Sequence, residues 1–138
     1  MTRFQAVVSG LALVGSVAAV LAVSSAVFGS SGRRASAEAL ARSVASEFFQ
    51  TINERRYART CDLLSAEFYR RNHVRDKKIC ALALTIGFTW SQEFRFRISG
   101  VSVDGDRAVV RAVADGAPGR IVLVREHGVF KVLAAENG

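Results

Sequence analysis

Residues 94–112, FRFRISGVSVDGDRAVVRA, decide the fold, because they read as two strands of a sheet and the turn between them. Phe94, Phe96 and Ile98 alternate with polar residues, which is the period of a strand with one buried face. The apolar positions then shift by one residue at Ser99-Gly100. A β-bulge produces such a shift, and glycine tolerates its backbone conformation. We therefore expect a bulged first strand with an arginine-rich outer face.

Turn signals divide the rest of the C-terminal half into three more strands. Asp104-Gly105 is a strong hairpin signal, residues 115–119 (DGAPG) read as a loop, and residues 126–128 (EHG) turn the chain again. The expected return strands cover residues 108–112, 121–124 and 129–133. This order predicts four antiparallel strands joined by hairpins.

Three helices are expected before the sheet. The first carries one apolar stripe with a four-residue repeat, formed by Leu40, Val44, Phe48 and Ile52, with Ala41, Ala45 and Phe49 beside it. Ser36 is its expected N-cap, and the pattern ends near Arg55. A second, shorter helix covers residues 57–64, and Ser65 caps the turn that follows it.

The third helix covers about residues 76–86, with Gly87 as its stop. Its expected inward residues are Cys80, Ala83 and Leu84. Helices followed by hairpin-connected strands predict an α+β domain, with three helices packed on a curved four-stranded antiparallel sheet.

The N-terminal segment, residues 4–32, carries no charged side chain. About 20 apolar residues suffice to cross a bilayer as a helix. We expect a single-pass anchor, because the apolar run is longer than most signal-peptide cores. The alternative is a cleaved secretory signal, with Arg3 in a weak basic region and cleavage sites at residues 22–24 and 24–26. No cysteine lies directly after the run, so a bacterial lipid anchor on cysteine is excluded.

The expected organisation is an anchor or signal with its linker over residues 1–32, then one α+β domain over residues 33–138. Arginines flank the apolar run on both sides, so the positive-inside rule does not favour export of the domain. Cys61 and Cys80 add a second signal, since two cysteines beyond a membrane segment predict a disulfide in an oxidising compartment. The alternative is two unpaired core thiols.

Four motifs carry a resemblance to a known superfamily. Residues 57–65, YARTCDLLS, resemble the Y-x-x-x-C-x-L-L-S segment of exported actinobacterial proteins of the nuclear-transport-factor-2-like (cystatin-like) superfamily. Cys80 fits the second cysteine of that pattern. Residues 103–110, VDGDRAVV, are similar to its V-x-G-D-x-A-x-V hairpin, and residues 128–132, GVFKV, resemble G-x-W-K-V with phenylalanine in place of tryptophan. The resemblance covers about residues 36–135.

The resemblance implies an extracytoplasmic domain with a cone-shaped sheet around the first helix and a pocket at the wide end. The residues expected near that pocket are Tyr57, Trp90, Phe94, Phe96 and Phe130. They are interpreted either as ordinary core or as the lining of a site for an apolar, lipid-like ligand.

The enzymes that share this resemblance are ketosteroid isomerases and polyketide cyclases, which use a carboxylate or histidine base in the pocket. The inward strand positions of this chain are apolar instead. Glu93 is a weak candidate base at the pocket mouth, and Tyr57 a weak candidate hydroxyl donor. His73 and His127 have no metal-ligand spacing. We therefore predict no catalytic residue, cofactor or metal site.

The chain is basic, with 19 Lys and Arg against 12 Asp and Glu and a net charge of +7. One basic run consists of Arg55, Arg56, Arg59, Arg70, Arg71, Arg75, Lys77 and Lys78. It reads either as a solvated helical face or as a contact for anionic lipid or envelope polymer. No nucleic-acid-binding module is present, and nucleic acid is a poor partner outside the cell.

These observations predict a non-enzymatic accessory or binding module at the cell envelope, tethered by its N-terminal helix, with a lipid, polymer or protein partner. The alternatives are an isomerase-like or cyclase-like enzyme of the same fold and a domain secreted after signal cleavage.

Overall fold

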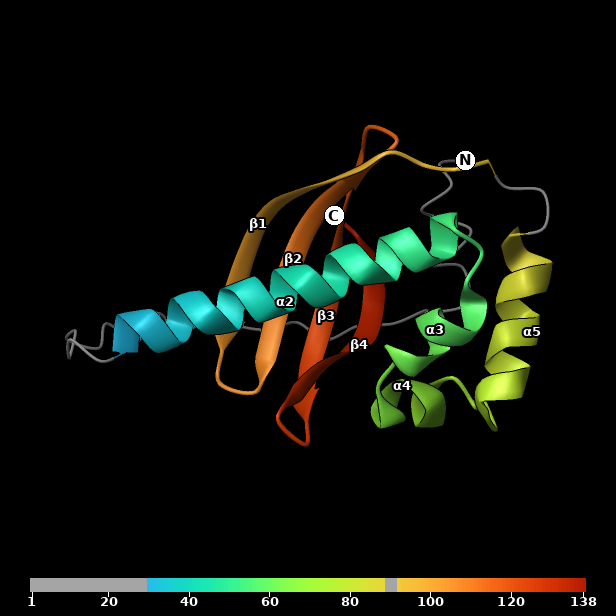
Figure 1. Ribbon diagram of the computed structural model, residues 1–138, viewed down its shortest axis with the longest axis horizontal. Coiled ribbons are helices and arrows are strands. Elements are labelled where there is room, and N and C mark those ends of the chain that lie inside the picture. The colour runs from blue at the N-terminus through green and yellow to red at the C-terminus, as the bar shows by residue number, and fades with distance from the viewer. Residues whose placement is uncertain (1–29, 89–91) are drawn as a thin grey trace.

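The computed structural model describes residues 30–88 and 92–138, which form an α+β domain (Figure 1). The helices are α2 (Ser30–Asn53), α3 (Tyr57–Asp62), α4 (Ala66–Arg71) and α5 (Lys77–Phe88). The strands are β1 (Phe96–Asp104), β2 (Arg107–Ala114), β3 (Ala117–Glu126) and β4 (Val129–Asn137). α2 crosses one face of the sheet, the short helices α3 and α4 lie below its C-terminal part in Figure 1, and α5 lies beyond its C-terminal end.

The sheet confirms the predicted antiparallel order, β1-β2-β3-β4. The expected bulge lies in β1, where Ile98 pairs with Ala112 and Gly100 pairs with Arg111. A Cβ on Gly100 would lie 3.2 Å from Nη2 of Arg111, so a side chain there would displace the guanidinium. β4 contains a second register shift, which the apolar pattern did not reveal.

The turn at Asp115-Gly116 is shorter than predicted, because residues 117–119 belong to β3 rather than to a loop. Asp115 and Gly116 have φ values of 49° and 80°. Positive φ at both central residues makes a two-residue turn whose twist matches the flanking strands. The chain therefore reverses at once, and Pro118 pairs with Val113 near the strand end.

The prediction of Ser36 as an N-cap is wrong, because Ser36 lies inside α2. The arginines and alanines around it favour helix, and no residue between Ser30 and Ser36 blocks it. The predicted stripe is also displaced at its start: Leu40 is 52% exposed, whereas Ala41 and Ala45 are buried. These small side chains bring the α2 backbone close to the sheet.

The other helices differ from the prediction in three places. The turn expected after Ser65 is a helix, α4, although Ser65 does cap it: Oγ accepts a hydrogen bond of 2.9 Å from the Phe68 N–H. Gly87 does not stop α5, which continues to Phe88. Ala83 is exposed rather than inward-facing, whereas Cys80 is buried and Leu84 is partly buried, as predicted.

The core lies between α2 and the sheet. Val110, Ile121 and Leu123 are fully buried, and the ring of Phe49 stacks on Phe96 at a centroid distance of 4.9 Å. A short bridge then joins the α3–α4 connection to the sheet, where the Ser65 N–H donates to the Val132 carbonyl at 2.8 Å. The small helices are thus tied to the far edge strand.

We expect Phe49→Ala to lower the free energy of unfolding by about 3–5 kcal/mol, because it removes a buried ring from a packed core. Leu40→Ala is the control and should cost less than about 0.5 kcal/mol, since Leu40 is exposed. Chemical denaturation of the full chain in non-ionic detergent measures both values. Equal losses in the two variants would show that the buried stripe of α2 has been misplaced.

Candidate functional site

The predicted membrane anchor lies outside the described residues. Within residues 30–88 and 92–138, no helix is long and apolar enough to cross a membrane. The first described helical residue is Ser30, which lies near the end of the uncharged stretch of residues 4–32.

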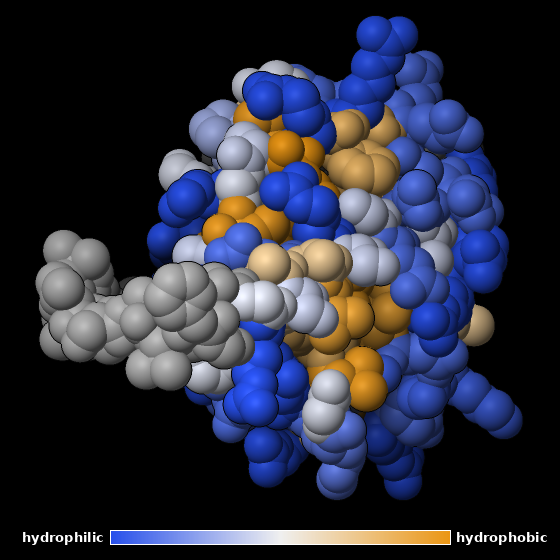
Figure 2. Space-filling view, turned by 60° about the vertical axis from the view of Figure 1, so that its left-hand side comes forward, coloured by the Kyte–Doolittle hydropathy of each residue, from blue (hydrophilic) through white to orange (hydrophobic). Residues whose placement is uncertain are grey.

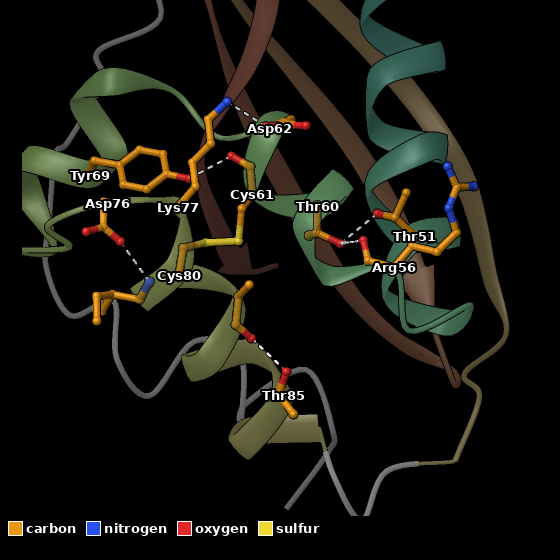
Figure 3. The surroundings of a disulfide bond; sticks show 12 residues. Thr51, Arg56, Thr60, Cys61, Asp62, Tyr69, Asp76, Lys77, Cys80 and Thr85 are labelled. Carbon is orange, nitrogen blue, oxygen red and sulfur yellow. Dashed lines mark hydrogen bonds and ion pairs between the residues drawn. A yellow bond between two sulfur atoms is a disulfide. The ribbon is translucent and has the colours of Figure 1, made fainter.

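Cys61 and Cys80 form the predicted disulfide, with their Cα atoms 6.1 Å apart (Figure 3). The bond joins α3 to α5. Polar contacts surround it: the Tyr69 hydroxyl donates to the Cys61 carbonyl at 2.7 Å, and Lys77 pairs with Asp62 at 2.6 Å. α5 packs chiefly against α3, so the disulfide is the main covalent and packing restraint on this helix.

The outward face of α5 is apolar. Cys80 points toward α3, and a helix turns by about 100° per residue, so Leu82 and Ile86 lie roughly opposite Cys80 and Ile79 lies about a quarter turn from it. The side chains of Ile79, Leu82 and Ile86 are 47%, 55% and 68% exposed, and Ala83 lies between them. We call these four residues the α5 outer face. Such an apolar stripe on a surface helix is typical of a contact surface.

The basic run does not form one uniform face. Four of its members are in ion pairs, namely Arg56 with Glu54, Arg59 with Glu47, Arg71 with Glu67, and Lys77 with Asp62. Arg70, Arg75 and Lys78 are exposed and form no ion pair with a described residue. Contact of the run with an anionic surface stays a prediction.

The residues expected in a pocket are divided by the structure. Phe96 lies in the core against Phe49, and Phe130 is buried beneath the guanidinium of Arg125, 4.5 Å from the ring centroid. Trp90 lies outside the described residues. Of the four that the structure describes, Tyr57 and Phe94 line a hollow.

That hollow, which we call the Tyr57 cavity, has a volume of about 190 Å³. Its lining is Ile52, Asn53, Arg55, Tyr57, Phe88, Gln92, Glu93 and Phe94. The Tyr57 ring stacks on Phe88 at 6.2 Å, and the Asn53 amide is engaged with the backbone of Phe94 on both its sides. Glu93 is exposed at the mouth, as its sequence position predicted.

Neither histidine forms part of a cluster. His73 and His127 are exposed and lie in turns, where each has a positive φ itself. In the described part of the chain, no group of three or more His, Cys, Asp or Glu side chains is placed to hold a metal ion.

A larger groove, which we call the α2 groove, lies between the first turns of α2 and the β1–β2 hairpin, with a volume of about 610 Å³. Arg33, Arg34 and Arg125 line it with Asp104. From the sequence, Arg33 and Arg34 were interpreted only as charges that flank the apolar run. The spacing of apolar and charged residues did not predict that Arg125 lies beside them. The signal that was available is the tandem arginine directly after an uncharged stretch.

Comparison with protein-family models and with curated proteins finds no match for the chain. The resemblance to nuclear-transport-factor-2-like proteins therefore stays a prediction that rests on the four motifs.

We expect the double variant Cys61→Ser/Cys80→Ser to lose about 3 kcal/mol of unfolding free energy, because the disulfide closes a loop with a sequence separation of 19 residues. Thermal denaturation with and without a reducing agent measures the effect. The reductant should destabilise the wild-type chain and leave the double variant unchanged. A wild-type chain that is insensitive to reductant would contradict a stabilising role for this bond.

A second prediction concerns Tyr69, where burial raises the pKa of the phenol above its usual value near 10, and the carboxylates of Asp62 and Asp76 raise it further. At a pH between the usual pKa of Tyr69 in the unfolded chain and its raised pKa in the folded chain, the folded chain binds more protons than the unfolded chain. The free energy of unfolding therefore falls as the pH rises past about 10. Tyr69→Phe should lose less stability between pH 9 and pH 11 than the wild type.

At neutral pH the same variant should cost about 1 kcal/mol, the usual net value of the lost hydrogen bond. Denaturant titrations of the wild type and of Tyr69→Phe at neutral pH, pH 9 and pH 11 give the free energies of unfolding to compare. Parallel losses in the two chains above pH 10 would mean that Tyr69 does not titrate differently in the folded state.

Proposed function

We propose that this chain is a non-enzymatic binding module of the cell envelope, held at the membrane by its N-terminal segment with the α+β domain on the extracytoplasmic side. The observation that carries the proposal is the α5 outer face. A soluble domain of this size ordinarily buries such a stripe, whereas here Ile79, Leu82 and Ile86 are each about half exposed or more.

The disulfide supports the extracytoplasmic location. Structural disulfides persist in oxidising compartments and are rare in the cytosol. Cys61 and Cys80 form one, and it holds the helix that carries the α5 outer face. The same disulfide therefore supports the extracytoplasmic location and holds the α5 outer face in place.

The length and direction of α2 support a position of the α5 outer face far from the proposed anchor. α2 has 24 residues, so it is about 36 Å long. Figure 1 shows α5 beyond its C-terminal end, while the anchor would join at Ser30. The α5 outer face would then face the envelope rather than the bilayer, which favours a protein partner for it.

The packing of the sheet supports a role in binding rather than catalysis. Inward-facing strand positions such as Val110, Ala112 and Ile121 are buried and apolar, so they supply no general base. α2 lies across the sheet as in the cystatin-like arrangement, and we propose membership of that superfamily on this basis and on the four motifs.

A small-molecule isomerase or cyclase is the second candidate, and the Tyr57 cavity is the observation that favours it. Arg55, Tyr57 and Glu93 bring three titratable side chains to one hollow. Two facts weigh against it. Its volume of about 190 Å³ is below the range of about 300–1,000 Å³ of ordinary ligand sites, and Glu93 is exposed, whereas a tuned base lies in a desolvated pocket.

We expect a photoreactive benzoylphenylalanine at position 82 to crosslink to an envelope protein in intact cells, because Leu82 lies at the centre of the α5 outer face. The same residue at position 102 is the matched control, since Ser102 is exposed on β1, far from α5. Immunoblots after irradiation should show an adduct for position 82 only.

Protease added to spheroplasts reports the topology in the same cells and should degrade the domain. Equal adducts at the two positions, or none, would contradict a specific surface on α5. Protection from the protease would contradict export, and recovery of the domain from the medium would contradict the tether.

A further inference from the structure

The α2 groove has the size of a ligand site and a composition that suits an anionic amphiphile. Its volume of about 610 Å³ lies within the usual range of about 300–1,000 Å³. Three arginines and one carboxylate line it, so its charged side chains carry a net positive charge.

The three arginines have no anionic partner among the described residues. Arg33, Arg34 and Arg125 are absent from every ion pair within 4.0 Å, although Asp104 lines the same groove. Six other Lys and Arg side chains of the described residues are in ion pairs. Cations that gather in one hollow repel each other, and an anion would relieve that repulsion.

Arg125 supplies an independent observation. Its Nε is buried and has no hydrogen-bond partner, while its guanidinium lies 4.5 Å from the centroid of the Phe130 ring. A buried donor without an acceptor is costly, and native structures seldom leave one unexplained. The stacking holds the guanidinium in place, and Arg125 also lines the groove, so an anion bound there would lie beside a positioned cation.

The rest of the lining is apolar. Leu40, which is 52% exposed, lies in the groove with Ala37 and Val103. Figure 2 brings the start of α2 toward the viewer and shows hydrophobic surface bordered by hydrophilic atoms on this side. Arginines beside exposed apolar side chains match a molecule with a phosphate at one end and hydrocarbon at the other.

The groove also lies where such a molecule would be found. The uncharged stretch of sequence ends at Gly32, and Gly32 itself is part of the groove lining. If the stretch crosses a bilayer, Arg33 and Arg34 lie at the level of the phospholipid headgroups. A membrane lipid is therefore favoured over a free phosphate compound.

We infer that the α2 groove binds the headgroup phosphate of an anionic phospholipid, with Arg33, Arg34 and Arg125 as its ligands. Leu40 and Val103 contact the glycerol and the start of the acyl chains. The inference rests on the tether in the proposed function and is independent of the α5 outer face.

Native mass spectrometry of the full chain in non-ionic detergent tests the inference, with phosphatidylglycerol and phosphatidylcholine as probes. We expect the wild type to bind phosphatidylglycerol in preference to phosphatidylcholine. The variant Arg33→Gln/Arg34→Gln/Arg125→Gln should weaken phosphatidylglycerol binding at least tenfold. The charge-matched control Arg42→Gln/Arg95→Gln/Arg97→Gln, whose side chains are exposed outside the groove, should stay within about twofold of the wild type.

The double variant Arg33→Gln/Arg34→Gln keeps Arg125 and tests the inference even if the loss of Arg125 disturbs the fold. Both side chains are exposed, so this variant should keep the wild-type circular dichroism and still weaken binding several-fold. Equal weakening in the control would overturn the inference in favour of general charge attraction. Displacement of the lipid by glycerol 3-phosphate at equal concentration would overturn it in favour of a soluble phosphate ligand.

A failed lipid test leaves the α5 crosslink unaffected, because the variants do not touch α5. Loss of lipid preference together with a retained crosslink would reject the groove site alone. Protease protection of the domain would instead reject the tether on which the groove site depends.

Discussion

The close approach of α2 to the sheet is the constraint on which the rest of the domain depends. Ala41 and Ala45 are fully buried at this contact, and their small side chains let this part of the helix lie close to the strands. Phe48, Phe49 and Ile52 then fill the space near the C-terminal half of the helix. Because α2 is one uninterrupted rod, it sets the two ends of the domain, with the α2 groove at its start and the three short helices at its finish.

The two ends differ in what stabilises them. The groove end is built from strand hairpins and the first turns of a long helix, which are parts of the main core. The other end has little core of its own: α4 has no buried residue, and α5 buries only Cys80 fully. There the disulfide, the bridge from Ser65 to Val132 and the hydrogen bond from Tyr69 to Cys61 replace packing. Polar and covalent links therefore position the surface that we propose as functional.

The strands could be predicted from the sequence because their signals are local. Period-two alternation located β1, the shift at Ser99-Gly100 located its bulge, and the dipeptides with glycine located the turns. The exposure of Leu40 and Ala83 could not be predicted, since an apolar residue on a helix is assigned a face only by its neighbours. For α5 the neighbour is α3, and the disulfide fixes which side of α5 lies against α3. The α2 groove was missed for the same reason, because Arg125 meets Arg33 and Arg34 only through the tertiary fold.

The disulfide has a consequence for when the α5 outer face exists at all. α5 packs chiefly against α3, and Cys80 is its one fully buried side chain. A newly made chain with reduced thiols would lack the bond that docks this helix, and its apolar stripe would not be presented in a fixed orientation. Oxidation after export would then complete the surface. If the domain is exported as we propose, it would become able to bind only in the oxidising compartment where the disulfide forms. The chain would therefore be unable to bind its partner before export.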